Sequence, residues 1–250
     1  MLTISPTRIR IFRDCPQRYA LTYVRRAPPA APSEGPQLAF GSSLHLALKQ
    51  YHGLVAARSL PPERLLRQCW VGGGYADPSQ EAEYFAEGVA ILRQYRESVR
   101  ADIPCNREVT LSQVVYLAWQ PVKLVGRVDR LDHCDDGGKE LLDYKTTATG
   151  TAPTPEQLAA DLPTYVYYSL GRLTFADAPR VAVSQLNLRT LDRSTAAYTP
   201  GRLAANDDAL AALAHAMGNG PYEARPGGRC SWCPVRRSCQ VGEISGGAVG

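Results

Sequence analysis

Residues 122–147 read VKLVGRVDRLDHCDDGGKELLDYKTT, and this stretch predicts two strands joined by a tight turn. Residues 122–134 are rich in valine and leucine that alternate with polar residues, a pattern typical of half-buried strands. The turn signal lies at residues 135–138, and residues 140–147 form the returning strand. We therefore expect an antiparallel hairpin here, preceded by another strand over residues 107–119.

Charged residues of this hairpin are expected to face one another. If the chain folds back near Asp136, Asp129 lies across from Asp143. Asp143 and Lys145 are two residues apart, so their side chains share one face of the strand. Two facing carboxylates repel unless a positive group lies between them, and a divalent cation is the obvious candidate. Magnesium prefers carboxylate, water and phosphate oxygens, and a nearby lysine can stabilise charge that develops on phosphate.

A simpler interpretation is that these charges are solvated on an exposed strand. Asp143 directly follows Leu141 and Leu142, however, and an unpaired carboxylate beside an apolar pair is costly. We therefore favour a metal site over a solvated strand.

The rest of the chain predicts mainly helices. Ser5 can cap a helix that runs to Tyr23, because Pro6 suits the first helical position. Further helices are predicted over residues 42–57, over 61–101 on both sides of three glycines at 72–74, over 156–170, and over 206–217 with Asn206 as cap and Gly218 as stop. Loops are predicted over residues 27–36 and 148–155, a strand over 181–190, and a flexible tail over 241–250. This order indicates a single α/β domain over residues 1–240.

The composition narrows the class of protein. The chain has 250 residues, of which 44% are hydrophobic, so it can bury a core and general disorder is excluded. No run approaches the roughly 18 apolar residues that a membrane-spanning helix needs. Arginines near the start argue against a secretion signal, so we expect a cytoplasmic protein. A net charge of +4 is compatible with a nucleic-acid partner, and no phosphate-binding motif of a nucleotide-driven motor occurs.

Seven cysteines in a chain without an export signal argue against a disulfide-bonded scaffold. Cys230, Cys233 and Cys239 cluster near the C-terminus, and Cys15 lies near the other end. Four thiolates can bind zinc in a tetrahedral site or hold an iron–sulfur cluster. Zinc sites usually use two short cysteine pairs, whereas here the fourth cysteine is solitary. The remaining cysteines, expected to be core or incidental thiols, are Cys69, Cys105 and Cys134.

The hairpin resembles the core of the PD-(D/E)xK nucleases, specifically the RecB-like branch that includes Cas4 and AddB-type nuclease domains. The resemblance rests on GRVDRLD (126–132) followed by LLDYKTT (141–147). It extends, in the family's order, to ISPTRIRIFRDCPQRYALTYV (4–24), FGSSLHLALKQYH (40–52) and CSWCPVRRSC (230–239). It implies an α/β, restriction-endonuclease-like core with a central mixed β-sheet flanked by helices.

The resemblance also implies which residues form the site. It implies that Mg²⁺ or Mn²⁺ is bound by His45, Asp129, Asp143 and the backbone carbonyl of Tyr144, and that Lys145 is the catalytic lysine. Two neighbouring residues are expected to lie outside this site. Glu108 matches the family only weakly and is expected to be a surface carboxylate, and His52 is expected to be structural.

One part of the chain departs from the family pattern. Related nucleases carry a glutamine four residues before a tyrosine, in a helix that follows the lysine. Here Asp161 stands at that position before Tyr165, and Gln157 lies one turn earlier. We treat all three residues as candidate DNA contacts.

At the two ends of the chain, the resemblance favours a [4Fe–4S] cluster over zinc. The cluster would be held by Cys15, Cys230, Cys233 and Cys239, and would join segments 1–26 and 225–240. Arginines of both segments would then form a basic surface suited to phosphate contacts.

The resulting hypothesis is a metal-dependent DNA nuclease, an exonuclease acting in DNA repair or recombination. Its partners would be single-stranded DNA or duplex ends and a separate helicase, with no membrane. Two alternatives stay open. One is a Cas4-type nuclease that works with CRISPR adaptation proteins in spacer acquisition, and the other is a non-catalytic DNA-binding partner subunit.

Overall fold

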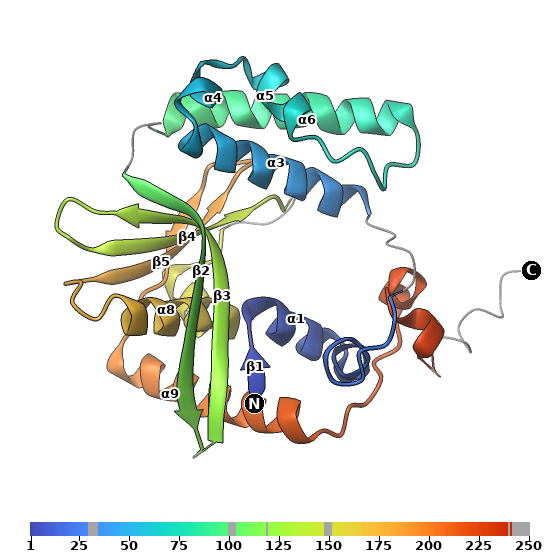
Figure 1. The fold of residues 1–250 in the computed structure, drawn as a ribbon, viewed down its shortest axis with the longest axis vertical. Coiled ribbons are helices and arrows are strands. Elements are labelled where there is room, and N and C mark those ends of the chain that lie inside the picture. The colour runs from blue at the N-terminus through green and yellow to red at the C-terminus, as the bar shows by residue number, and fades with distance from the viewer. Residues whose placement is uncertain (30–34, 100–103, 119, 148–151, 240, 242–250) are drawn as a thin grey trace, which may run out of the picture.

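The computed structural model describes residues 1–29, 35–99, 104–118, 120–147, 152–239 and 241. It has an α/β fold in which a mixed central sheet is flanked by helices (Figure 1), as the sequence predicts. Helices α3 to α6 form a layer on one side of the sheet, while α8 and α9 lie on the other. Of the predicted tail over 241–250, residues 242–250 lie outside the described residues.

The sheet has six strands: β1 (Leu2–Ile4), β2 (Cys105–Leu117), β3 (Gln120–His133), β4 (Lys139–Lys145), β5 (Val181–Asn187) and β6 (Arg193–Thr195). Their order is β1-β3-β4-β5-β6, with β2 paired to β3 outside this path. The sheet is mixed because β1 is parallel to β3 and β5 is parallel to β4, whereas the other pairs are antiparallel. The short strands β1 and β6 were not predicted from the sequence.

The helices, in chain order, are α1 (Pro6–Asp14), α2 (Pro16–Tyr19), α3 (Pro36–Gly53), α4 (Val55–Ser59), α5 (Pro62–Gln68), α6 (Pro78–Ser98), α7 (Pro155–Ala160), α8 (Leu162–Thr174) and α9 (Pro200–Asn219). A π-helical turn, η1 (Ala20–Val24), follows α2, and two 3₁₀ turns, η2 (Gly228–Trp232) and η3 (Arg236–Ser238), lie near the C-terminus. The helices predicted on both sides of the three glycines correspond to α5 and α6.

Two other strands, β1 and β4, pair with different parts of the same edge of β3. Strand β2 occupies the other edge along nearly the whole length of β3. On the shared edge, β1 pairs with residues 122–124 and β4 pairs with residues 130–133. Residues 125–129 therefore lie between β1 and β4 and have no strand partner on that edge within the described part of the chain. Asp129 lies at the end of this interval.

The predicted hairpin of β3 and β4 is confirmed, including its register. Arg130 pairs with Leu142 and His133 with Lys139, which places Asp129 and Asp143 one step beyond the last ladder pair. The turn depends on Gly137, whose φ of +79° is unfavourable for other residues.

Two apolar cores lie on opposite faces of the sheet. The first is formed with α1, α8 and α9 and includes Ile9, Leu124, Val166, Leu170 and Met217. The second is formed with α3, α5 and α6 and includes Phe40, Leu44, Leu66, Leu92 and Leu142. Gly126 permits close packing in the first core, because a Cβ there would lie 2.9 Å from the Tyr167 ring and from Leu170.

The predicted N-terminal helix is interrupted at Cys15. Ser5 caps α1 as expected, since its hydroxyl accepts from the Arg8 amide at 3.2 Å. Cys15, however, has an extended backbone, and its Sγ accepts a hydrogen bond from the Arg18 amide at the start of α2. Pro16 has no amide proton to continue the helical ladder, which is the physical reason for the break.

Other helix boundaries also differ from the predictions. The helix predicted over 42–57 begins at Pro36 and ends at Gly53, after which α4 starts. The helix predicted over 156–170 is divided at Asp161 into α7 and α8.

The predicted cap at Asn206 is wrong. Helix α9 begins at Pro200 with Thr199 as its cap, and it ends at Asn219 with Gly220 as its C-cap, beyond the predicted stop at Gly218. Asn206 lies inside α9, where its buried amide donates to the Ala159 carbonyl at 2.8 Å. A buried partner on α7 therefore explains this asparagine, which looked like a cap in the sequence. Across the described residues, no helix is both long and apolar enough to cross a membrane.

Candidate active site

Side chains from one helix and two strands meet beside the unpaired interval of β3. His45 of α3 lies with Nδ1 3.0 Å from Asp129 Oδ1 of β3. The other oxygen of Asp129 accepts a hydrogen bond from the Tyr144 amide of β4 at 2.8 Å. On β4, the Lys145 ammonium forms an ion pair with Asp143 Oδ2. The structure thus brings His45, Asp129, Asp143 and Lys145 together around Tyr144.

The arrangement follows from local geometry. Alternation along β4 puts Asp143 and Lys145 on one face of the strand and the Tyr144 side chain on the other. The Tyr144 ring packs in the second core, edge-on to the His45 ring with centroids 5.8 Å apart. Asp129 can accept from the Tyr144 amide because the β3–β4 ladder has ended one residue earlier.

The two carboxylates are largely withdrawn from solvent. The Asp129 side chain is 19% exposed and that of Asp143 is 12% exposed. Burial lowers the pKa of His45, but its hydrogen bond to the Asp129 carboxylate and the charges of both aspartates outweigh burial and raise the pKa above its ordinary value. Each carboxylate therefore lies beside a positive or protonatable group, as mutual repulsion requires.

A family model for the PD-(D/E)XK nuclease superfamily matches residues 3–240 of the chain. The chain belongs to the PD-(D/E)XK nuclease superfamily. The solved structures add that it is similar to a Eubacterium rectale protein provisionally named an exonuclease, with 11% identity and a TM-score of 0.53, over 98% of this chain and 93% of that one. It is also similar to SSO0001, with 14% identity and a TM-score of 0.39, over 81% and 84% of the two chains. No curated protein matches the sequence.

PD-(D/E)XK nucleases typically use Mg²⁺ or Mn²⁺, and the donor set of this chain fits such an ion. Asp143 Oδ2 is buried and accepts no hydrogen bond, although the Lys145 ammonium is its ion-pair partner. In the described part of the chain, no three His, Cys, Asp or Glu side chains are spaced as an assembled metal site. The fit therefore rests on the chemistry of the donors, which are two carboxylates and an imidazole.

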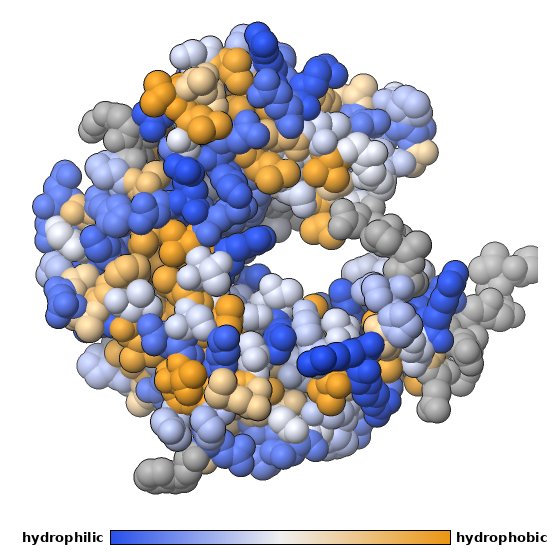
Figure 2. Space-filling view, viewed as in Figure 1, coloured by the Kyte–Doolittle hydropathy of each residue, from blue (hydrophilic) through white to orange (hydrophobic). Residues whose placement is uncertain are grey.

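Figure 2 shows a deep notch near the middle of the molecule, between its upper and lower parts. Comparison with Figure 1 places α3, which carries His45, above the notch and α1 below it. Hydrophilic residues gather at the inner end of the notch.

Glu108 is less peripheral than its sequence suggested. Its neighbours Arg107 and Val109 pair with Arg130 and Val128, so Glu108 falls level with Asp129. Its side chain is 24% exposed and forms an ion pair with Lys49, one turn beyond His45 on α3. Its φ of +45° is rare for a residue with a side chain. The strand predicted over residues 107–119, if paired with the strand over 122–134, could have indicated from the sequence that Glu108 lies level with Asp129.

A buried polar network lies beneath these residues. Arg130, only 2% exposed, makes two hydrogen bonds to Asp132 at 2.7 Å each. Its Nη1 also donates to the Tyr95 hydroxyl at 2.7 Å and lies 3.2 Å from His52 Nε2. The Tyr95 and Tyr144 hydroxyls are 2.9 Å apart. These polar residues come from distant parts of the chain, so the sequence alone did not indicate that they meet.

His52 gives this network a pH dependence that can be measured. Burial and the charge of Arg130 lower its pKa from 6.5 to about 3. Between these values the unfolded chain binds a proton at His52 and the folded chain does not, so stability falls as the pH falls. We expect His52 to account for about 1.4 kcal/mol of lost unfolding free energy per pH unit between about pH 6 and 4.

Denaturant unfolding of wild-type protein and His52→Gln at several pH values tests this expectation. The difference between the two free energies of unfolding should shrink steadily on acidification through that window. The matched control is His215→Gln, because His215 is exposed on α9 and should leave the profile unchanged. Parallel profiles for wild type and His52→Gln would refute a neutral, buried His52.

The candidate DNA contacts have structural partners in the protein. Gln157 forms a capping box with Thr154 at the start of α7, and Asp161 caps α8 by accepting from the Thr164 amide. The Tyr165 hydroxyl donates to Asp207 of α9 at 2.6 Å. These bonds explain the residues without DNA, so their contact with DNA stays a prediction.

Tyr167 is a site neighbour that the sequence pattern missed. It lies on α8, and its hydroxyl donates to the Arg127 carbonyl at 2.9 Å. Burial raises its pKa, and the negative charges of Asp143 and Asp129 raise it further, so its hydroxyl stays protonated. No motif distinguishes it from the other tyrosines of α8, because only packing on Gly126 turns it toward the carboxylates.

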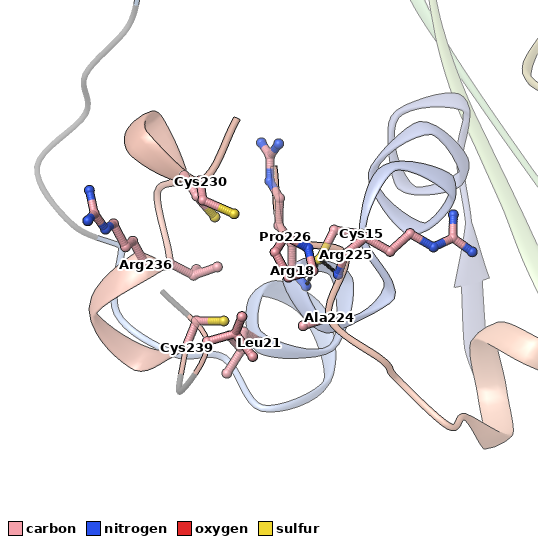
Figure 3. Close-up of a pocket in the computed structure, with 12 residues that line it drawn as sticks. Cys15, Arg18, Leu21, Ala224, Arg225, Pro226, Cys230, Arg236 and Cys239 are labelled. Atoms are coloured by element: carbon pink, nitrogen blue, oxygen red, sulfur yellow. Dashed lines mark hydrogen bonds between the residues drawn. The ribbon is translucent and has the colours of Figure 1, made fainter. Parts of the chain in front are cut away.

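The four clustered cysteines line a single pocket between the two ends of the chain (Figure 3). Figure 3 shows the side chains of Cys230 and Cys239 extending from the C-terminal segment toward Cys15 on the opposite wall. Cys15 Sγ accepts hydrogen bonds at 3.4 Å from the amides of Arg18 and Arg225. The ion pair of Arg229 with Asp14 also joins the two segments. The remaining cysteines lie outside this pocket; they are Cys69, Cys105 and Cys134.

Proposed function

We propose that the protein is a divalent-metal-dependent deoxyribonuclease that hydrolyses phosphodiester bonds from DNA ends, in DNA repair or recombination. The observation that carries the proposal is the Asp143–Lys145 pair, which lies beside Asp129 and His45 in a chain of the PD-(D/E)XK nuclease superfamily. The exonuclease activity named for the Eubacterium rectale protein is extended to this chain as part of the proposal.

The residues would divide the work as follows. Asp129, Asp143 and the backbone carbonyl of Tyr144 would hold Mg²⁺ or Mn²⁺, with His45 as a further ligand. The ion would supply Lewis-acid polarisation of the phosphodiester and activation of water. Lys145 would orient the attacking water and stabilise negative charge that develops on the phosphate. The ion pair with Asp143 supports this role, because it holds the ammonium group at the carboxylate edge of the site.

DNA is the substrate class that the charge of the protein favours. The net charge is +4, and arginines 8, 10, 13, 18, 25 and 26 lie in the N-terminal segment that contains α1, α2 and η1. Phosphate contacts by such side chains would bind DNA without reading its sequence. The proposal therefore expects cleavage that depends on DNA ends and little on base sequence.

Removal of divalent ions should abolish cleavage. We expect no cutting of end-labelled DNA in excess EDTA, and recovery when Mg²⁺ or Mn²⁺ is restored. Ca²⁺ should support DNA binding better than cutting, because it takes looser and larger coordination than Mg²⁺. Single-stranded, blunt duplex and closed circular DNA in the same assay test the need for an end.

Three outcomes of this assay would count against the proposal. Cleavage that persists in excess chelator would remove the metal mechanism. Efficient cutting of closed circles would show endonuclease action in place of exonuclease action. A protein that binds DNA but never cuts it with any of these ions would be the non-catalytic subunit instead.

We further propose that Cys15, Cys230, Cys233 and Cys239 bind a [4Fe–4S] cluster. Four thiols around one pocket are the donor set that such a cluster requires. The two amide hydrogen bonds to Cys15 Sγ support ligation, since hydrogen bonds to sulfur tune cluster sites. The cluster would be structural, because none of the residues that line its pocket belongs to the candidate active site.

A further inference from the structure

Arg130 contacts each structural element that carries a candidate active-site residue. It follows Asp129 on β3, and its guanidinium reaches His52 on α3 and the tyrosine hydroxyls of α6 and β4. The same α3 carries His45, two turns before His52, and the same β4 carries Asp143 and Lys145. The buried guanidinium of Arg130, on β3, therefore contacts side chains of α3, α6 and β4.

The charged pair in this network, Arg130 with Asp132, is a weak source of stability. A buried ion pair loses the hydration of both groups, and apolar residues of similar volume often stabilise a protein equally well or better. Arg130 and Asp132 are 2% and 7% exposed, in a region otherwise filled by apolar and aromatic side chains. The pair instead fixes the orientation of Arg130, because its guanidinium donates to Asp132 through two nitrogens.

Tyr144 transmits that orientation to the site. Its hydroxyl lies 2.9 Å from Tyr95, which in turn accepts from Arg130, so the ring is anchored at its far end. Its backbone lies between Asp143 and Lys145 and donates to Asp129. A shift of the Tyr144 backbone would therefore move Asp143 and Lys145 relative to Asp129, and the anchored ring opposes such a shift.

We propose that Arg130, acting through the hydroxyls of Tyr95 and Tyr144, is a positioning residue that sets the geometry of the divalent-metal site. The proposal rests on the proposed function in one respect, that the site binds Mg²⁺ or Mn²⁺. Groups that orient metal ligands from behind typically change metal affinity or activity by about 10–100-fold when they are removed.

Tyr95→Phe is the first test, because it removes the hydroxyl that bonds to Arg130, Tyr144 and His52 and leaves only a direct contact of 3.4 Å between Arg130 and Tyr144. We expect Mn²⁺ affinity, measured from the electron paramagnetic resonance signal of free Mn²⁺, to fall by about tenfold or more. The kcat for DNA cleavage should fall as well, while KM for DNA stays the same. The matched control is Tyr51→Phe, since Tyr51 packs against Tyr95 in the same core but has no part in the hydrogen-bond network.

The double variant Arg130→Met with Asp132→Leu provides a second test. It removes both charges together, so no unpaired charge is left in the core, and thermal unfolding should stay near that of wild type. We expect it to bind Mn²⁺ as weakly as Tyr95→Phe. Wild-type Mn²⁺ affinity in both variants would overturn the positioning role. Wild-type protein that binds Mn²⁺ but cuts no DNA would instead overturn the nuclease proposal, and the affinity comparison would still decide the role of Arg130.

Discussion

Lys145→Ala should abolish most DNA cleavage and leave the protein folded. The Lys145 ammonium is 27% exposed at the edge of the site, so its loss removes no part of either apolar core. Removing one group that stabilises charge in a transition state costs about 10²–10³ in kcat. We expect a fall of that size with end-labelled DNA and Mn²⁺, with little change in the thermal unfolding midpoint.

The control is Lys139→Ala at the other end of β4. Lys139 Nζ lies 2.9 Å from His133 Nδ1, in the part of the hairpin nearest the turn, so the same truncation there should leave the rate unchanged. Equal loss in both variants would mean a general effect on the hairpin. Wild-type cleavage by Lys145→Ala would refute the role of the lysine.

Asp143→Ala should abolish cleavage for a different reason. Asp143 is the carboxylate whose buried oxygen accepts no hydrogen bond, and we propose it as a metal ligand. Its loss should therefore weaken Mn²⁺ binding, whereas Lys145→Ala should leave Mn²⁺ binding intact. Two inactive variants that differ in metal affinity would separate the ligand from the charge stabiliser, and equal affinities would contradict this division.

The hairpin was predictable because its determinants are local. Alternation along residues 122–134, a turn that needs Gly137, and the return strand together fix the register. That register alone puts Asp129 near Asp143 and puts Lys145 on the face of Asp143. The strands that carry Asp129, Asp143 and Lys145 were therefore contained in one short stretch of sequence, whereas His45 comes from α3.

The surroundings of the site were not predictable, because they depend on contacts between distant segments. Tyr167 turns toward the carboxylates only because Gly126 lets α8 approach β3 closely. Arg130 looked like one more charge on a strand, although its partners lie on α3, α6 and β4. Asn206 had the sequence signature of a helix cap, yet it serves a carbonyl on α7. In each case a tertiary partner overrides a local rule.

The attachment of the C-terminal segment to the N-terminal segment depends entirely on contacts between residues that are distant in the sequence. The N-terminal segment meets the C-terminal segment through a few polar contacts, such as Gln17 with the Glu223 carbonyl at 3.3 Å and Arg229 with Asp14 at 2.6 Å. Turns η2 and η3 contain no buried residue of their own, and the apolar contacts of this segment are few: Val235 between the turns is buried, and Tyr222 packs against Tyr19. Exposed ion pairs contribute at most about 1 kcal/mol each. A cross-link through the four cysteines is therefore the contact that would hold the C-terminal segment in place.

Cys15→Ser should consequently lose the cluster and much of the stability. The cluster would close a loop that runs from Cys15 to Cys230. By analogy with disulfides, closing so long a loop removes about 4–5 kcal/mol of unfolded-state entropy, so the free energy of unfolding should fall by about that amount. Serine keeps an acceptor for the Arg18 amide, which restricts the change to loss of the cluster ligand. Anaerobic wild-type protein should be brown with about four irons per chain, and Cys134→Ser, outside the pocket, should match it. Colourless anaerobic protein with one zinc, or full stability in Cys15→Ser, would contradict the cluster.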